Sequence, residues 1–135
     1  MIEAICFDLG DTLVAEETVI HNSCGQAITA RVIEGVFEVL EDYFDVIVIS
    51  EEVGIEKPDK QVFQVALDKL GVEAQNAVMV GNRIDADIVG ANRIGMKSVW
   101  FRWNDRYEEI IGSEEEKPGF IIKSLAELPG ILSSI

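Results

Sequence analysis

Basic residues are scarce in this chain. Its 135 residues include 11 lysines and arginines against 25 aspartates and glutamates, which gives a net charge of -14 at pH 7. An acidic surface of this kind repels the phosphates of nucleic acids and anionic membranes, so neither is expected as a partner. Cysteine is also rare. Cys6 lies in an apolar segment and Cys24 in a polar one, so we expect reduced thiols rather than a disulfide framework.

Long hydrophobic runs are missing as well. No segment approaches the roughly 18 to 20 apolar residues that a membrane-spanning helix needs. The start at Met1-Ile2-Glu3 lacks the basic residues of a secretory signal. The composition, 48% hydrophobic and 27% charged, is that of a globular protein with a core. We therefore expect one cytoplasmic domain over residues 1–135 and no membrane partner.

Strand patterns alternate with helical patterns along the chain. The predicted strands are residues 2–8, 44–50, 77–81, 97–101 and, as a short extended piece, 120–122. The predicted helices are residues 26–42, a helix from Pro58 to Gly71, a helix from Ile84 to Gly95, and a last one after a capping box of Ser124 and Glu127. This order predicts an α/β fold, in which a mostly parallel sheet is covered by helices on both faces and strand 2–8 lies in its middle.

Polar side chains gather where the predicted strands end. They are Asp8, Asp11 and Thr12 after the first strand, Ser50 at the second, Lys57 before the next helix, and Asn82, Asp85 and Asp87 after the third strand. Open α/β sheets bind their ligands at this edge. A carboxylate nucleophile, a hydroxyl, a lysine and an acidic cluster suit phosphoryl transfer, in which Mg2+ and an ammonium offset the developing charge. Each residue also has an ordinary structural role as an alternative, for instance a turn cap for Asp8.

The segment Phe7-Asp8-Leu9-Gly10-Asp11-Thr12-Leu13 resembles the opening motif of the haloacid dehalogenase-like (HAD) hydrolases, an apolar strand followed by Asp-x-Asp-x-Thr. A longer similarity runs through residues 43–45, 50–59, 80–91 and 95–96. The resemblance implies a Rossmann-like three-layer sandwich and a magnesium-dependent phosphatase that forms an aspartyl-phosphate on Asp8. By the same resemblance, Asp8, Thr12 and Lys57 are catalytic, a second-motif hydroxyl for which Ser50 is a candidate joins them, and the Mg2+ ligands are Asp8, Gly10 through its carbonyl, Asn82 and Asp87.

Two substitutions depart from the pattern of that family. Gly10 stands where its phosphatases have the acid that protonates the leaving group, and the next carboxylate is Asp11. A missing general acid costs on the order of 10²- to 10⁴-fold in rate, so we expect a slow enzyme. Asn82 stands where the family has a metal-binding aspartate. Its amide oxygen still suits Mg2+ but brings no charge, and Asp85 is a nearby substitute.

A deletion is the third departure. Only about thirty residues separate the opening motif from Tyr43, which leaves no room for the cap domain that is common in the family. The strand that presents the second-motif hydroxyl is also affected, and two registers are open. In one, residues 18–23 are its remnant and His21 replaces the hydroxyl. In the other, which we favour because a parallel crossover needs about a dozen residues, residues 46–49 lie beside the first strand and Ser50 provides the hydroxyl.

Without a cap, the site would be open to a large phosphorylated substrate, even a macromolecular one, or to a partner subunit in a homo-oligomer. Aromatic and basic residues near one strand end form a candidate substrate lip or dimer patch: Trp100, Phe101, Arg102, Trp103 and Arg106. The sequence therefore predicts a capless phosphohydrolase. The alternatives are an impaired relative that binds phosphorylated ligands or proteins, and a receiver-like phospho-acceptor domain.

Overall fold

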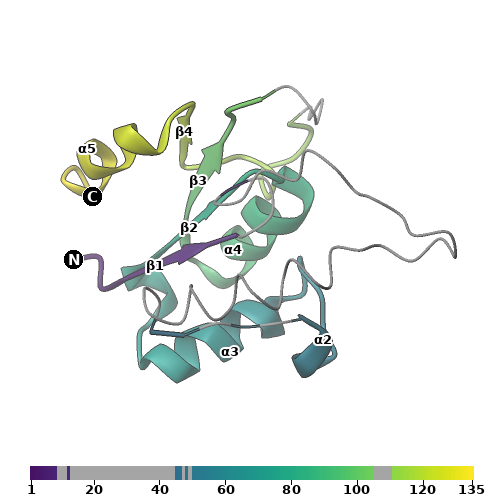
Figure 1. Ribbon diagram of the computed structural model, residues 1–135. Helices are drawn as coiled ribbons and strands as arrows, with labels where there is room; N and C mark the ends of the chain where they lie inside the picture. The colour runs from purple at the N-terminus through teal and green to yellow at the C-terminus, as the bar shows by residue number, and fades with distance from the viewer. Residues whose placement is uncertain (9–11, 13–44, 47, 49, 105–110) are drawn as a thin grey trace, which may run out of the picture.

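A single parallel sheet organises the computed structural model, which describes residues 1–8, 12, 45, 46, 48, 50–104 and 111–135. Its strands run in the spatial order β1 (Ala4–Phe7), β2 (Ala77–Gly81), β3 (Lys97–Phe101) and β4 (Phe120–Ile122), and every neighbouring pair is parallel (Figure 1). These bounds confirm four of the predicted strands. The sheet and its helices are of the α/β, Rossmann-like class that the sequence predicts.

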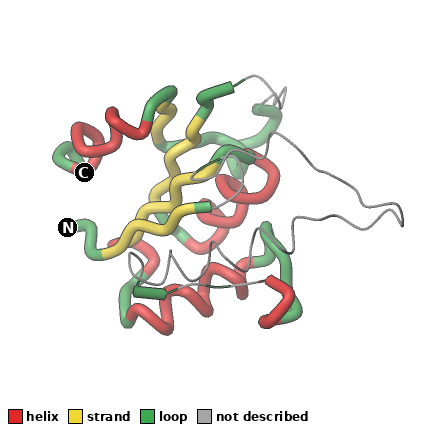
Figure 2. The backbone as a smooth tube through the Cα atoms, in the orientation of Figure 1, coloured by secondary structure: helices red, strands yellow, loops and turns green. Residues whose placement is uncertain are grey.

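Helices cover both faces of this sheet, as Figure 2 shows. The five residues of β2 are all buried, and their side chains alternate between two cores because successive strand residues point to opposite faces. Ala77 and Met79 pack toward α3 (Lys60–Leu70) and α4 (Val89–Ile94). Val78 and Val80 belong to the opposite core, which includes Leu128 of α5 (Leu128–Leu132). A strand buried on both faces explains why this run is continuously apolar.

Caps define the ends of the helices. Asp59 caps α3 by accepting a hydrogen bond from the Gln61 main-chain nitrogen, so the helix begins at Lys60 rather than at Pro58. Gly71 ends α3 in the left-handed conformation (φ 69°), which glycine adopts without strain. The short 3-10 turn η1 (Ala74–Asn76) then leads into β2. The predicted capping box of Ser124 and Glu127 is confirmed at the 3-10 turn η3 (Leu125–Glu127), just before α5.

The helix predicted from Ile84 to Gly95 is divided into two parts. Its first part is η2 (Ile84–Ile88), a π-helical turn, and the second is α4. Within the described part of the chain, no helix has the length and apolar character needed to cross a membrane.

The strand predicted over residues 44–50 is wrong where the structure describes it. Residues 45, 46 and 48 are not in a strand, and Ser50 begins the one-turn helix α2 (Ser50–Val53). The Gly54 main-chain nitrogen donates to the Ser50 carbonyl oxygen (2.8 Å), which closes this turn. Among the described strands, β1 therefore has only β2 as a neighbour and lies at an edge rather than in the middle. The predicted helix over residues 26–42 lies outside the described residues.

Candidate active site

Asp8 stands directly after β1, at the carboxyl edge of the sheet. Its main-chain nitrogen donates to the Val80 carbonyl oxygen (2.9 Å), which continues the pairing of β1 with β2 by one residue. This hydrogen bond fixes the backbone of Asp8 on a rigid part of the fold. The side chain is 18% exposed, so the carboxylate is largely shielded but still reachable from solvent.

Lys57 joins Asp8 to a second carboxylate. Its Nζ atom lies 2.5 Å from Oδ1 of Asp8 and 2.6 Å from Oδ1 of Asp87. The lysine comes from the segment between α2 and α3, whereas the two aspartates follow β1 and β2. One ammonium thus faces two carboxylates, and this group of three side chains carries a net negative charge when all are ionised.

Asp87 is the most deeply buried member of the site, with its side chain only 1% exposed. The Arg83 main-chain nitrogen donates to its Oδ2 atom (3.1 Å) across the π-helical turn η2. Gly81 lies against the same side chain, and a Cβ atom at position 81 would overlap the Cβ, Cγ and Oδ2 atoms of Asp87. The end of β2 and the turn that follows are therefore shaped around this carboxylate.

Burial and charge act in opposite directions on the two buried ionisable groups. Burial raises the pKa of Asp87 above its ordinary value, although Lys57 and the Arg83 nitrogen favour the carboxylate. Burial also opposes the ammonium of Lys57, but Asp87 and Asp8 outweigh it, and the pKa of Lys57 is raised. The lysine is consequently an ammonium at neutral pH.

A buried hydroxyl lies on the other side of Asp8. Oγ1 of Thr12 is 3.3 Å from Oδ2 of Asp8 and 3.4 Å from Oδ1 of Asn82. A hydroxyl has one proton, so Thr12 donates to one of these oxygens at a time. The main chain of Asn82 is fixed in turn by Trp100, because the Nε1 atom of Trp100 donates a hydrogen bond to the Asn82 carbonyl oxygen (3.0 Å).

The structure brings together five of the site residues that the sequence predicts: Asp8, Thr12, Lys57, Asn82 and Asp87. Ser50 is the first residue of α2. Among the described residues, no hydrogen bond connects its hydroxyl to any of these five side chains. Asp85 pairs instead with Arg83 at an exposed position. Gly10, Asp11 and His21 lie outside the described residues, as does Arg106.

Two residues support the site in ways that the sequence did not predict, since Trp100 was expected in a substrate lip or dimer patch and is instead buried. Trp100 anchors the main chain of Asn82, and Gly81 makes room for Asp87. The signal for Trp100 was its place at the end of a predicted buried strand, since a buried indole N–H needs an acceptor. The signal for Gly81 was a glycine at the point where a strand meets an acidic turn, which marks a close approach.

The donor set suits a hard divalent cation. Asp8 and Asp87 provide two carboxylates within reach of one Lys57 atom, and Asn82 provides an amide oxygen next to Asp8. Mg2+ is bound in proteins by one or two carboxylates with further oxygen ligands and waters. Among the described residues, no group of three or more acidic, histidine or cysteine side chains is placed to hold a metal ion. The two carboxylates and the amide are the side-chain oxygens here that could contact one.

A parallel α/β sheet with an aspartate, a lysine and a hydroxyl at its carboxyl edge defines the class of this protein. The profile of the HAD-hydrolase-like family matches residues 54–128. The chain is also 37% identical over 93 residues to the glyceraldehyde 3-phosphate phosphatase of Pyrococcus furiosus, a match that covers 69% of this chain and 38% of that protein. The chain belongs to the HAD-hydrolase-like family, and it spans well under half the length of that relative.

Solved structures share the fold. A crystal structure of a HAD phosphatase from Thermococcus onnurineus matches with a TM-score of 0.63 and 31% identity, over 80% of this chain and 47% of that one. An uncharacterized protein from Listeria monocytogenes matches with a TM-score of 0.65 and 25% identity, over 98% of both chains. The second similarity therefore extends over nearly the whole of both molecules.

Proposed function

We propose that this protein is a phosphohydrolase in which Asp8 is the nucleophile. The observation that carries the proposal is the position of the Asp8 carboxylate at the carboxyl edge of the sheet, contacted by Lys57 on one oxygen and Thr12 on the other. The Pyrococcus furiosus relative is named as a phosphatase, which supports the same reaction class. Lys57 and Thr12 hold the carboxylate in one orientation, and a fixed orientation lowers the entropic part of the barrier.

The reaction has two steps. An Asp8 oxygen forms a bond to the phosphorus atom of a phosphate ester while the bond from phosphorus to the leaving oxygen breaks. The leaving alkoxide takes a proton from water, and the hydroxide formed is neutralised by the proton that the second step releases. A water molecule then attacks the aspartyl-phosphate, which releases inorganic phosphate and restores the Asp8 carboxylate. The Lys57 ammonium offsets negative charge on the transferring group in both steps.

Mg2+ is the cofactor that this donor set fits. Asp8, Asp87 and Asn82 would hold it, and the carbonyl of Gly10 is a further ligand by the family resemblance. When bound, the ion supplies positive charge beside the phosphate oxygens. Lys57 already neutralises part of the charge of Asp8 and Asp87, and Asn82 adds none, so we expect the site to bind Mg2+ more weakly than a site with three carboxylates.

The substrate that we propose is a phosphorylated small molecule. The relative from Pyrococcus furiosus is named for a phosphorylated three-carbon metabolite. The interval of only about thirty residues between the opening motif and Tyr43 supports a domain without an inserted cap. An open edge of this kind also admits a macromolecular substrate, which assays with phosphopeptides would detect.

The direct test is release of phosphate from p-nitrophenyl phosphate in the presence of magnesium, manganese or cobalt. Its good leaving group relaxes the need for the acid that Gly10 cannot supply. We expect slow turnover that Asp8→Asn abolishes, because an amide is a poor nucleophile. Absence of turnover with every metal would contradict the proposal and favour a protein that binds phosphorylated ligands. An aspartyl-fluoroberyllate adduct on Asp8 would then show whether the metal and phosphate site is competent.

A further inference from the structure

Trp100 of β3 lies against the turn that follows β2. Its partner in the parallel register is Gly81, the residue directly before Asn82. The indole is 5% exposed, and its Nε1 atom donates to the Asn82 carbonyl oxygen (3.0 Å), as a buried indole N–H requires. The ring forms a buried cluster with Ile84 and Ile88 of η2. One side chain from the neighbouring strand therefore contacts both the start of this turn and its helical part.

The two proposed metal ligands in this turn are held in different ways. The Asp87 carboxylate accepts a hydrogen bond from the Arg83 main-chain nitrogen, a contact within the turn itself, and pairs with Lys57. Asn82 lies at the start of the turn, where Trp100 holds its main chain from the next strand. The directions open to a side chain depend on the backbone that carries it. Trp100 thus limits where the amide of Asn82 can point.

The direction of this amide matters more than that of a carboxylate would. A carboxylate has a full charge and two equivalent oxygens, whereas a carboxamide has one oxygen and an NH2 group that only donates hydrogen bonds. Oδ1 of Asn82 lies 3.4 Å from Oγ1 of Thr12, which also contacts Asp8. A turn of the main chain at position 82 would move this single oxygen away from Asp8, and no second oxygen would replace it.

We propose that Trp100 is a positioning residue for metal binding, whose indole N–H keeps the Asn82 amide oxygen available to the divalent cation of the candidate active site. This inference rests on the proposed function for the presence of a cation at that site. Groups that orient metal ligands typically change affinity by about 10- to 100-fold when they are removed. We expect the lower end, about tenfold, because Trp100 acts on one ligand of several.

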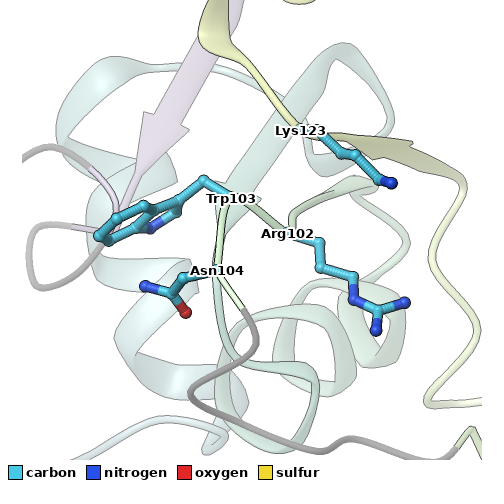
Figure 3. Close-up of a pocket in the computed structure, with 4 residues that line it drawn as sticks. All are labelled: Arg102, Trp103, Asn104 and Lys123. Atoms are coloured by element: carbon cyan, nitrogen blue, oxygen red, sulfur yellow. The ribbon is translucent and has the colours of Figure 1, made fainter.

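The second tryptophan of the chain provides a matched control. Trp103 is 39% exposed, whereas Trp100 is buried. It lines a surface pocket together with Arg102, Asn104 and Lys123 (Figure 3). The two indoles are two positions apart in the sequence, but only that of Trp100 contacts the turn after β2 among the described contacts. The same chemical change at the two positions therefore separates loss of the hydrogen bond from a general effect of the replacement.

The first experiment places 3-benzothienylalanine at position 100 by genetic-code expansion. This analogue keeps the shape of the indole but has sulfur in place of the N–H group, so the packing stays and the hydrogen bond is lost. Titration with MnCl2, followed by the paramagnetic resonance signal of free Mn2+, measures metal affinity without substrate, and Mn2+ takes the same oxygen ligands as Mg2+. We expect Kd to rise about tenfold. The analogue in place of Trp103 should leave Kd unchanged.

Two further variants keep this test sharp. Trp100→Phe also lacks the N–H group and should raise Kd at least as much, and urea unfolding shows that each protein is folded. In Asn82→Asp, either carboxylate oxygen can bind the cation, so the analogue at position 100 should raise Kd by less than about threefold. Equal losses in the wild type and in Asn82→Asp, or no loss in either, would overturn the positioning role of Trp100.

The outcomes separate this inference from the proposed function. Turnover of p-nitrophenyl phosphate with Mn2+, together with an unchanged Kd in the analogue protein, would overturn the inference and leave the proposed function. Mn2+ binding that depends on Trp100 in a protein without any turnover would support the inference and contradict the proposed function. Absence of Mn2+ binding by the wild type would overturn the inference together with the metal site.

Discussion

The ammonium of Lys57 lies 2.6 Å from Oδ1 of Asp87, a carboxylate whose side chain is 1% exposed. The same ammonium lies 2.5 Å from Oδ1 of Asp8, so one lysine pairs with two acidic groups that follow different strands. Removing one partner of a buried ion pair leaves the other partner buried with an uncompensated charge. This lowers the free energy of unfolding more than replacing both partners by apolar residues does. Lys57 is therefore expected to matter for folding as well as for chemistry.

Lys57→Met should lower the free energy of unfolding by about 2 to 4 kcal/mol, because Asp87 is then buried without its cation. Urea unfolding at neutral pH measures this change. Adding Asp87→Asn in the same protein should recover part of the loss, since the buried group is then neutral. Lys69→Met, at an exposed position on α3, is the control and should change stability by less than about 0.5 kcal/mol. Additive effects of Lys57→Met and Asp87→Asn would show that the pair is not coupled.

Stability should decrease at alkaline pH for the same reason. The pKa of Lys57 is raised in the folded protein above the ordinary value of 10.5, because Asp87 and Asp8 outweigh the effect of burial. Folding then favours the protonated lysine. This contribution is complete below pH 10.5 and is lost as the pH rises through the higher pKa of the folded state.

The measurement is the difference in unfolding free energy between the wild type and Lys57→Met as a function of pH. We expect this difference to be constant from neutral pH to about pH 10 and to decrease above it. Other lysines and tyrosines titrate in both proteins and cancel in the comparison. A difference that stays constant at higher pH would mean that the raised pKa is wrong.

The strands and most helix ends could be predicted because their signals are local. The run of residues 77–81 is apolar throughout, and Gly71 and Gly95 end their helices in left-handed conformations. The error over residues 44–50 has a different origin. A β-branched run indicates a strand only where a neighbour completes the hydrogen bonds, and among the described strands only β2 pairs with β1. Whether a neighbour is present depends on the whole fold rather than on the run itself.

The site residues were predictable in part. Their positions at the ends of predicted strands and at the start of a predicted helix indicated Asp8, Thr12, Lys57, Asn82 and Asp87, and the family resemblance gave each of them a role. The contact of one lysine with two carboxylates was not predictable, because it depends on how the segment before α3 packs against η2. The support of Asn82 by Trp100 was missed for the same reason, since it joins residues 18 positions apart through a side chain.

Gly81→Ala tests how closely the sheet edge fits Asp87. A methyl group at position 81 overlaps the Asp87 side chain, so the buried carboxylate must move away from Lys57. We expect a loss of about 1 to 3 kcal/mol in stability, as for other overpacked sites, together with a loss of activity. Gly130→Ala is the matched control, because nothing lies within 4 Å of a Cβ atom there. Normal stability and activity in Gly81→Ala would contradict the described position of Asp87.

Asn82→Asp should strengthen binding of Mg2+. The new carboxylate would stand beside Asp8 with the same Thr12 contact available, so it adds a negative charge to the donor set. Without metal the like charges should lower the melting temperature, and saturating MgCl2 should raise it more than in the wild type, because a ligand stabilises the folded state that binds it. Thermal unfolding with and without MgCl2, with NaCl at equal ionic strength as the control, measures both effects. An equal response of the two proteins to Mg2+ would remove position 82 from the metal site.

Gly10→Asp should restore the acid that the sequence lacks. A carboxyl group at this position can protonate a poor leaving group, and general acid catalysis contributes on the order of 10²- to 10⁴-fold. The rate for hexyl phosphate should therefore rise much more than the rate for p-nitrophenyl phosphate, whose leaving group needs no proton. Gly10→Asn has a side chain of the same size without an acidic proton and should leave both rates low. Equal gains for the two substrates would show that position 10 does not deliver a proton to the leaving group.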